Sequence, residues 1–368
     1  MKTATVIGSG ISGCMYAWAL KQKGWEVTVV EKLPFIGGGV RTFFHAGHPF
    51  TYGPRHFLSP YPEAYNFVND VVPLRDIDKI NISFQEDLDD FFYYPPHEDD
   101  IKKLPEAEQI YKELEERPEV AEGDNYEDYY TQRVGKTIYE RYNNHFNKKA
   151  WMLESNAEMD FGIAATLKRN ALESGPPHEY KDWYNCYPIE REGYNRLFDF
   201  LVQDCTIRLE AEIVEFDLDG PAVVLSDGER IESDILVSTI SADTLMNYEY
   251  GELRYVGREC YFMVLPIEEV FPKDTYFLYY PSKNVKHTRL VEYKKFTQHK
   301  SPNTLVVLEV PSKMNKLYPM LIQKEVDLAQ KYIDAMPDHV YSVGRMGTYR
   351  YVDIDDIILA GFEFSKEM

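Results

Sequence analysis

The chain has 368 residues, with 40 Lys and Arg against 61 Asp and Glu, and therefore a formal net charge of −21. This charge argues against a nucleic-acid partner, because proteins bind phosphate backbones through neutralising Lys and Arg side chains. Hydrophobic residues make up 44% and charged residues 27%, as in ordinary globular proteins, so the composition argues against bulk disorder and the length suggests about two or three domains.

The N-terminal segment lacks the pattern of a signal peptide, because the apolar stretch after Lys2 is interrupted by glycines. No apolar run in the sequence reaches the roughly 18 residues that a membrane span needs. The four cysteines form no C-x-x-C pair, so neither a zinc site nor a dithiol is indicated. We expect a cytoplasmic protein with reduced thiols, no bound metal and no membrane partner.

The first 30 residues predict a strand–helix–strand unit. Residues 3–7 (TATVI) predict a short buried strand, residues 14–23 a helix and residues 26–30 (EVTVV) a second apolar strand. A glycine-rich turn joins the first strand to the helix. This order and length are typical of the βαβ unit that opens a dinucleotide-binding fold.

The turn carries Gly8, Gly10 and Gly13 in G-x-G-x-x-G spacing. The first glycine permits the tight turn, the second lets the backbone approach a pyrophosphate, and the third allows close packing of helix and strand. The helix N-terminus then faces the negative charge. Glu31, at the end of the second strand, has the position of a carboxylate that binds a ribose hydroxyl. We expect a dinucleotide site; a glycine turn without a ligand is the alternative.

The residues after Glu31 favour FAD over NAD. The sequence continues as Lys32-x-x-x-Ile36-Gly37-Gly38-Gly39. An acidic residue followed by glycines several positions later resembles the extended motif of FAD proteins of the glutathione-reductase type, especially the amine-oxidase-like branch. Residues 234–240 (DILVSTI) resemble the late strand that returns to the nucleotide domain in that class.

The rest of the chain divides into three kinds of segment. Residues 33–60, rich in Gly, Pro, His and aromatic residues, predict loops that line a ligand. Residues 62–160 predict a mainly helical, acidic region whose carboxylates face solvent. Apolar β-branched segments predict strands within 205–241, with a hairpin at Asp227-Gly228, and at 260–265, 275–280, 289–293 and 304–310, and a helix follows at 325–336.

Seven further segments, in order along almost the whole chain, resemble motifs of one family, the UDP-galactopyranose mutases. They are Tyr52-Gly53-Pro54-Arg55-His56-Phe57; Val134-Gly135-Lys136-x-Ile138-Tyr139-Glu140 with Phe146-x-Lys148-Lys149-x-Trp151; Tyr184-x-x-Tyr187-Pro188-Ile189 with Gly193-Tyr194-Asn195-x-Leu197; Tyr250-Gly251-x-Leu253-x-Tyr255; Thr288-Arg289-Leu290-x-Glu292-x-Lys294-x-Phe296; Tyr318-Pro319; and Gly344-Arg345-x-Gly347-x-Tyr349-x-Tyr351-x-Asp353.

The resemblance implies an α/β fold. A discontinuous Rossmann-like FAD-binding domain would comprise residues 1–76, 195–245 and 335–368. A mainly helical lid domain would comprise residues 77–170, and an antiparallel sheet domain residues 171–194 and 246–334.

The resemblance also implies a reaction. Family members interconvert the pyranose and furanose forms of a nucleotide-diphosphate sugar, UDP-galactose, without net redox change. N5 of reduced FAD attacks the anomeric carbon and expels UDP, and the sugar–flavin adduct opens and recloses before UDP returns. The cofactor acts as the nucleophile, and the protein supplies orientation and charge. Members in bacteria are commonly homodimers.

The resemblance assigns the catalytic candidates. Arg289 matches an arginine that binds the diphosphate, and the family's second such arginine corresponds to Leu172, or to Arg169 after a three-residue shift. Asp353 is alternatively a helix N-cap, and each tyrosine is alternatively a structural core residue. The full set is Arg289, Tyr318, Tyr349, Tyr351, Asp353, Arg55, His56 and Arg169.

The binding candidates come from the same motifs. Aromatic side chains in the helical region would stack on the nucleotide base, although a helical aromatic stripe is more often core. The substrate-binding candidates are Tyr142, Phe146, Trp151, Tyr184, Asn195, Arg289, Tyr318 and Tyr349. The cofactor-binding candidates are Gly8, Gly10, Ser12, Gly13, Glu31, Lys32, Gly38, Gly39, Tyr52, Gly53, Pro54, Arg345, Tyr351, Asp353 and Ile354.

The chain departs from the family pattern beside the flavin and the sugar. Arg55 and Leu58 replace the two loop histidines, and His56 lies one position out of register. Residues 190–192 enlarge a turn near the sugar. Two other functions therefore stay open: a flavin oxidase or desaturase of the amine-oxidase type, and a non-catalytic nucleotide-sugar binder that retains FAD.

Overall fold

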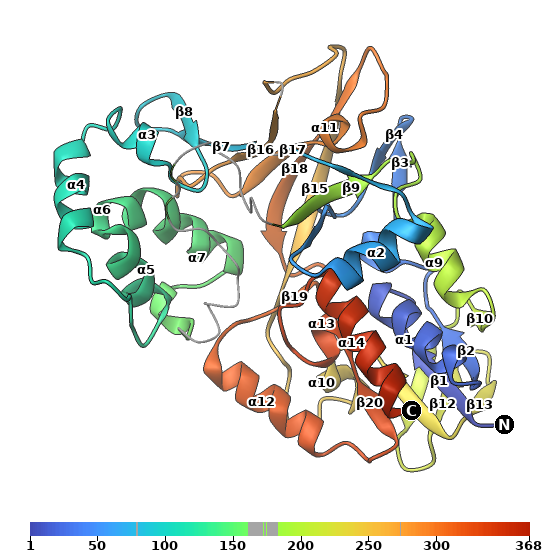
Figure 1. Cartoon of the computed structure of the whole chain (residues 1–368). Coiled ribbons are helices and arrows are strands. Elements are labelled where there is room, and N and C mark those ends of the chain that lie inside the picture. Colours follow the sequence, from blue (N-terminus) through green and yellow to red (C-terminus); the bar gives the residue numbers. More distant parts are fainter. Residues whose placement is uncertain (79, 161–171, 173, 175–182, 273) are drawn as a thin grey trace.

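The structure is a computed structural model that describes residues 1–78, 80–160, 172, 174, 183–272 and 274–368. Figure 1 shows helices α3–α7 at the left, a large mixed sheet at the top, and a parallel sheet with its helices at the lower right. None of the helices within these described ranges is long and apolar enough to cross a membrane.

The predicted strand–helix–strand unit is confirmed and begins a five-stranded parallel sheet. Val6 pairs with Val29 on one side and with Val237 on the other, so the late strand does return to this domain as predicted. In spatial order the strands are β10 (Thr206–Arg208), β2 (Glu26–Val30), β1 (Thr3–Ile7), β14 (Ile235–Ser238) and β20 (Val340–Ser342).

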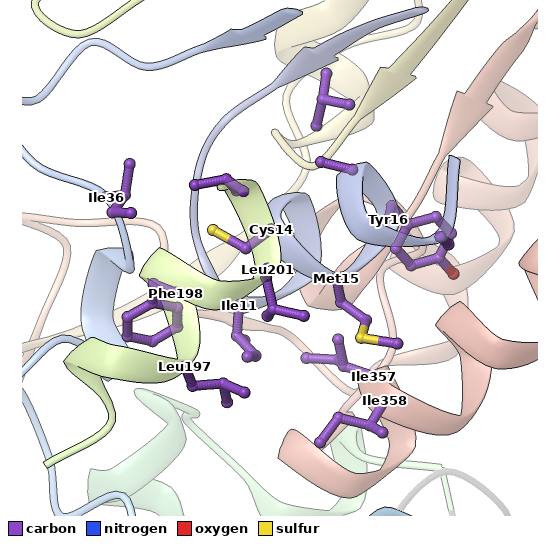
Figure 2. Close-up of a cluster of buried hydrophobic side chains, with 14 of the residues drawn as sticks. Ile11, Cys14, Met15, Tyr16, Ile36, Leu197, Phe198, Leu201, Ile357 and Ile358 are labelled. Carbon is purple, nitrogen blue, oxygen red and sulfur yellow. The ribbon is translucent and has the colours of Figure 1, made fainter. Parts of the chain in front are cut away.

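Both faces of the parallel sheet are covered, which explains its continuous apolar strands. One face packs against α1 (Ile11–Gln22), α9 (Asn195–Val202) and α14 (Ile354–Glu367). Figure 2 shows Met15 of α1 against Ile357 and Ile358 of α14. Alternate strand residues face the other way and pack against a three-stranded antiparallel sheet of β11 (Ile213–Asp217), β12 (Ala222–Leu225) and β13 (Arg230–Glu232).

The large sheet has seven strands and is antiparallel except where β16 pairs with β7. In spatial order its strands are β19 (Tyr318–Pro319), β15 (Tyr255–Leu265), β18 (Thr304–Ser312), β17 (Arg289–Glu292), β16 (Thr275–Tyr279), β7 (Ile80–Gln85) and β8 (Asp90–Tyr93). The expectation of a mainly helical segment was wrong for residues 80–93. β7 has the alternating burial of a strand, but the acidic residues around it concealed this pattern.

Two small sheets complete the strands. β9 pairs with β5 and β6 rather than with the large sheet. Their members are β3 (Phe43–His45) with β4 (His48–Phe50), and β5 (Phe57–Ser59) with β9 (Tyr184–Pro188) and β6 (Leu74–Asp76).

The helical region contains a π-helix within a run of short helices. Its elements are α3 (Glu98–Ile101), α4 (Ala107–Glu116), α5 (Tyr126–Val134), α6 (Lys136–Ile138), the π-helix η2 (Tyr139–Asn144), α7 (His145–Trp151) and η3 (Asn156–Glu158). The remaining described helices are η1 (Gly38–Val40), α2 (Pro62–Val71), α10 (Ala242–Leu245), α11 (Tyr293–Thr297), α12 (Gln323–Asp334) and α13 (Gly344–Gly347).

Two polar contacts attach this helical region to the large sheet. The Lys149 ammonium donates hydrogen bonds to the carbonyls of Tyr280, Ser282 and Val285 at 2.7–3.1 Å. Arg141 pairs with Asp87, in the connection between β7 and β8, at 2.9 Å. These contacts fix the helices beside the strands that carry the candidate ligand-binding arginines.

Candidate functional site

A cavity of about 430 Å³ begins at the glycine turn, and we call it the glycine-loop cavity. Gly10 and Ser12 line its start, and Arg289 and Tyr318 line it beside the large sheet. The turn itself is held by Glu31, whose carboxylate accepts hydrogen bonds from Ser9 N at 2.8 Å and Leu33 N at 2.9 Å. The carboxylate of Glu31 also accepts from Ser9 Oγ at 2.8 Å and therefore fixes the loop, but the residue is buried and does not line the cavity.

A second cavity of about 150 Å³ lies against the helical region, and we call it the aromatic cavity. Tyr94, Phe146 and Tyr279 line it, and Tyr94 and Tyr279 stack with ring centroids 4.2 Å apart. Both cavities are lined by Tyr279, Arg289, Tyr318 and Tyr351, so they meet at these side chains.

Four guanidinium groups surround Tyr318 at this junction, from Arg55, Arg258, Arg289 and Arg345. Arg258 and Arg345 lie over the Tyr318 ring, with Cζ 5.2 and 4.9 Å from its centroid. A Cβ placed on Gly53 would lie 3.8 Å from a guanidinium nitrogen of both Arg55 and Arg289, so these two groups flank one point.

The positive charge of the cluster is only partly neutralised by the protein. Arg289 Nε donates to the Glu309 carboxylate at 2.8 Å, and Arg345 lies 3.5 Å from Asp353. Across the described part of the chain, these are the only two carboxylates in ion pairs with the four arginines. Burial also lowers the pKa of Arg258, as expected for a cation removed from water. The arrangement favours a ligand with more than one negative charge.

Tyr318 is an unusually acidic phenol because of this cluster. Burial by itself raises its pKa, but the charges of Arg55, Arg345, Arg258 and Arg289 outweigh burial and lower the pKa to about 8. The phenol is therefore the group whose charge responds to an anion entering the cluster.

Eight of the fifteen cofactor candidates line the glycine-loop cavity, together with four of the catalytic candidates, Arg55, His56, Arg289 and Tyr318. The candidates that line it are Gly10, Ser12, Gly39, Pro54, Arg55, His56, Arg289, Tyr318, Arg345, Tyr351, Asp353 and Ile354. Arg55 donates hydrogen bonds to the carbonyls of Gly39 and Tyr52, at 3.2 and 2.8 Å. Asp353 is also the N-cap of α14, with a capping box to Asp356, so the structural alternative for Asp353 is correct as well.

Four glycines support the loops without lining either cavity. Gly8 adopts φ +90° beside Thr239, Gly13 packs against Gly8, and Gly38 lies against Gly10. Gly53 lies beside Arg55 and Arg289. Lys32 is exposed next to the buried Glu31.

Four tyrosine and asparagine candidates contact other parts of the protein and do not line the two cavities. The Tyr349 hydroxyl accepts from Met320 N and donates to the Arg254 carbonyl, and the ring is 2% exposed. Tyr184 stacks on Tyr65, and Asn195 exchanges hydrogen bonds with the backbone of Thr42. Tyr52 packs against Phe43 and Phe50. None of these four side chains lines either described cavity.

The substrate candidates of the helical region separate into two groups. Phe146 and Trp151 line the aromatic cavity, as expected. Tyr142 does not line it but is buried in the hydrophobic cluster of the helical region, and its neighbour Asn143 lines the cavity instead. Arg169 lies outside the described residues. Leu172, at the position expected for the second diphosphate arginine, packs against the same cluster.

Sequence reasoning missed Arg258, Glu309 and Asn143. Arg258 on β15 carries no motif, and only the strand register brings it near Tyr318. Glu309 interrupts an otherwise apolar strand, TLVVLEVPS, and a lone carboxylate in such a strand was a usable signal. Asn143 gave no signal, because its position depends on the π-helix.

The fold and the two cavities define a protein of the Rossmann-like dinucleotide-binding class with a cluster of four arginines where the cavities meet. A family model for UDP-galactopyranose mutase matches residues 141–351, and one for an NAD(P)-binding Rossmann-like domain matches residues 6–71. The first match covers more than half of the chain, and the chain belongs to the UDP-galactopyranose mutase family. Its reaction class is therefore isomerisation, and the family uses a flavin cofactor.

Individual relatives agree with this membership. A protein of Klebsiella pneumoniae named "Probable UDP-galactopyranose mutase" is 23% identical over 398 residues, which span 100% of this chain and 94% of that protein. The crystal structure of a reduced UDP-galactopyranose mutase has a TM-score of 0.83 at 17% identity and covers 100% of this chain and 95% of the other, which shows the shared fold. A 1-hydroxycarotenoid 3,4-desaturase of Flavobacterium is 43% identical, but over 17% of this chain and 12% of that protein.

The glycine loop fits a dinucleotide. A Cβ added to Gly10 would meet no described atom within 4 Å, so its Cα faces open space where a pyrophosphate can approach. A Cβ added to Gly13 would lie 1.9 Å from the carbonyl oxygen of Gly8, so this glycine serves the packing of α1 on β1.

These two glycines should therefore respond differently to the same substitution. Gly10→Ala should fold with an unchanged melting temperature of the cofactor-free protein, yet retain much less flavin, because the methyl group occupies the approach of the pyrophosphate. Gly13→Ala should lower stability by roughly 1–3 kcal/mol or more through overpacking. Thermal unfolding and the flavin absorbance of the purified proteins distinguish the two effects. Full flavin content in Gly10→Ala would contradict a pyrophosphate at this turn.

Proposed function

We propose that this protein binds FAD and, with the cofactor reduced, interconverts the pyranose and furanose forms of a nucleotide-diphosphate sugar, UDP-galactose or a related sugar. Family membership supports the reaction class. The observation that carries the proposal is the arginine cluster at the junction of the glycine-loop and aromatic cavities. A dianionic diphosphate at this junction would place its sugar toward the cofactor and its base toward the helical region.

Two of the four arginines would bind the diphosphate of the substrate, and the other two would face the cofactor. Arg258 and Arg289 line the aromatic cavity and would hold the diphosphate as it leaves the sugar. Arg289 is oriented for this by Glu309, which fixes Nε and leaves the terminal nitrogens to the ligand. Arg55 and Arg345 line the glycine-loop cavity and would face the cofactor. Arg345 is fixed by two hydrogen bonds to the Val352 carbonyl.

The bound reduced flavin would supply a nucleophilic nitrogen for the anomeric carbon. The protein stabilises the charge that develops on the departing diphosphate through fixed guanidinium groups. Tyr318 and Tyr351, stacked with centroids 5.9 Å apart, line both cavities and would place hydroxyl groups between sugar and diphosphate. Aromatic walls on the other side exclude water from the same region.

The direct test is conversion of UDP-galactofuranose by the purified protein with and without dithionite, followed by separation of the nucleotide sugars. A flavin spectrum with conversion only in the reduced sample would support the proposal. A flavin spectrum without conversion would reject this substrate and favour an oxidase, a different sugar or a non-catalytic binder. Absence of flavin would overturn the cofactor assignment.

Arg289→Ala should reduce turnover by at least about 10³-fold while the flavin content stays that of the wild type, because the variant loses charge stabilisation in the transition state. Arg289→Lys keeps the charge but loses the planar fork of donors, so its turnover should lie between that of the wild type and that of Arg289→Ala. Arg230→Ala, which removes an ion pair with Asp217 on the surface of β13, is the matched control and should turn over normally. If Arg289→Ala retained its turnover, the proposal that Arg289 binds the diphosphate would be wrong.

The acidity of Tyr318 predicts a pH effect on binding. Because its folded-state pKa is lowered to about 8, its ionisation contributes stability that is present above the ordinary value near 10 and is lost as pH falls through 8. A bound diphosphate competes for the same guanidinium groups and returns Tyr318 to its neutral form, so binding takes up a proton above pH 8.

The affinity for UDP should therefore fall by up to about tenfold per pH unit above pH 8, well beyond the phosphate ionisation near 6. Tyr318→Phe should show no such fall, and calorimetric titration between pH 7 and 9.5 measures both proteins. If the affinity of Tyr318→Phe for UDP fell with pH as steeply as that of the wild type, another group would take up the proton.

A further inference from the structure

Asn143 is a buried amide side chain with an unused acceptor. The residue is 8% exposed, and within the described residues its Oδ1 accepts no hydrogen bond. It lines the aromatic cavity. Buried amide oxygens in folded proteins nearly always have a partner, because an unpaired one forfeits its hydration without compensation. A ligand in the aromatic cavity could therefore supply the missing hydrogen-bond donor for Asn143 Oδ1.

Asn143 lies at the cavity because of the π-helix in which it stands. Residues 139–144 form the wider turns of η2 between two α-helical segments. This local widening shifts the phase of the side chains, so that Tyr142 enters the hydrophobic cluster at 1% exposure while Asn143 lines the cavity. Such π-turns inside α-helices occur frequently at functional sites.

The residues around Asn143 indicate which kind of ligand would fit the aromatic cavity. Phe146 and the stacked pair Tyr94 and Tyr279 present aromatic surfaces to the same cavity. Trp151 also lines this cavity, and its buried Nε1 donor has no partner in the described part of the chain. Apolar rings together with an unpaired donor and an unpaired acceptor suit a flat heterocycle with polar edges.

We propose that Asn143 binds the edge of the nucleotide base, with its Oδ1 accepting the N3–H of uracil and its Nδ2 donating to a neighbouring base carbonyl. This inference rests on the proposed function, because it takes the ligand to be a uridine nucleotide. The base then lies in the aromatic cavity, and Arg258 and Arg289 at the same cavity bind its phosphates.

The contact is best tested through N3. A half rotation of the Asn amide exchanges its donor and acceptor, so a comparison of uracil with cytosine would not isolate this side chain. Methylation of N3 removes the hydrogen and adds bulk whichever way the amide is turned. A cycle of two proteins and two ligands then measures whether Asn143 and N3 interact.

Binding of UDP and of 3-methyluridine 5′-diphosphate should be measured by calorimetry to the wild-type holoenzyme and to Asn143→Ala. Wild type should bind the methylated ligand at least about tenfold more weakly than UDP. Asn143→Ala should bind UDP about tenfold more weakly than wild type and discriminate between the ligands by less than about threefold, because it lacks the acceptor and leaves room for the methyl group.

Asn144→Ala is the matched control. Asn144 is the next residue of the same π-helix, but its side chain donates to Glu140 and it does not line the cavity. It should keep the wild-type discrimination between the two ligands. Flavin absorbance and thermal unfolding show whether each variant is folded, and the comparison of ligands on the wild type does not depend on any variant.

The outcomes separate this inference from the proposed function. Wild type that binds neither ligand would overturn the proposed function and this inference with it. Wild type that binds UDP but does not distinguish the methylated ligand would overturn only the role of Asn143. The same follows if the effects of Asn143→Ala and N3 methylation are additive.

Discussion

The arrangement of this protein depends on an excess of partly buried positive charge around Tyr318. Each guanidinium group costs free energy to remove from water, and two carboxylates within ion-pair distance offset only part of that cost. The four arginines come from four separate places: the loop before β5, β15, β17 and α13. The packing of the seven-stranded sheet against the loops of the dinucleotide-binding domain therefore assembles the cluster.

The two halves of the site differ in how much of them is shared with other proteins. The desaturase match is short, as expected if the shared feature is the dinucleotide-binding turn and not the reaction. The match to the mutase family model instead covers residues 141–351, which include the last helices of the helical region and strands β15 to β19 of the large sheet. These elements supply Trp151, Arg258, Arg289 and Tyr318. Function in this chain is therefore argued from the arginines and the aromatic cavity, not from the glycine turn.

The local parts of the fold were predictable from sequence, but the assembly of the site was only partly so. The glycine spacing and the apolar period gave β1, α1 and β2, because each depends on neighbouring residues. Arg258 and Glu309 approach Arg289 and Tyr318 only through pairing between strands distant in sequence, which no local pattern encodes. Tyr142 and Asn143 show the same limit within one helix. The family resemblance assigns Tyr142 to the ligand, whereas the structure places Tyr142 in the hydrophobic cluster and Asn143 at the aromatic cavity.

Arg55 changes the electrostatics of the cofactor side relative to the family pattern. A histidine at this position titrates near neutral pH, whereas a guanidinium group stays charged at every physiological pH. The carbonyls of Gly39 and Tyr52 fix this guanidinium group beside the glycine-loop cavity, so its charge is held in place before a ligand enters. Tyr318 moderates the same charge by losing its own proton as the pH rises. At this position the loop therefore carries a fixed positive charge and has no group that exchanges a proton near neutral pH.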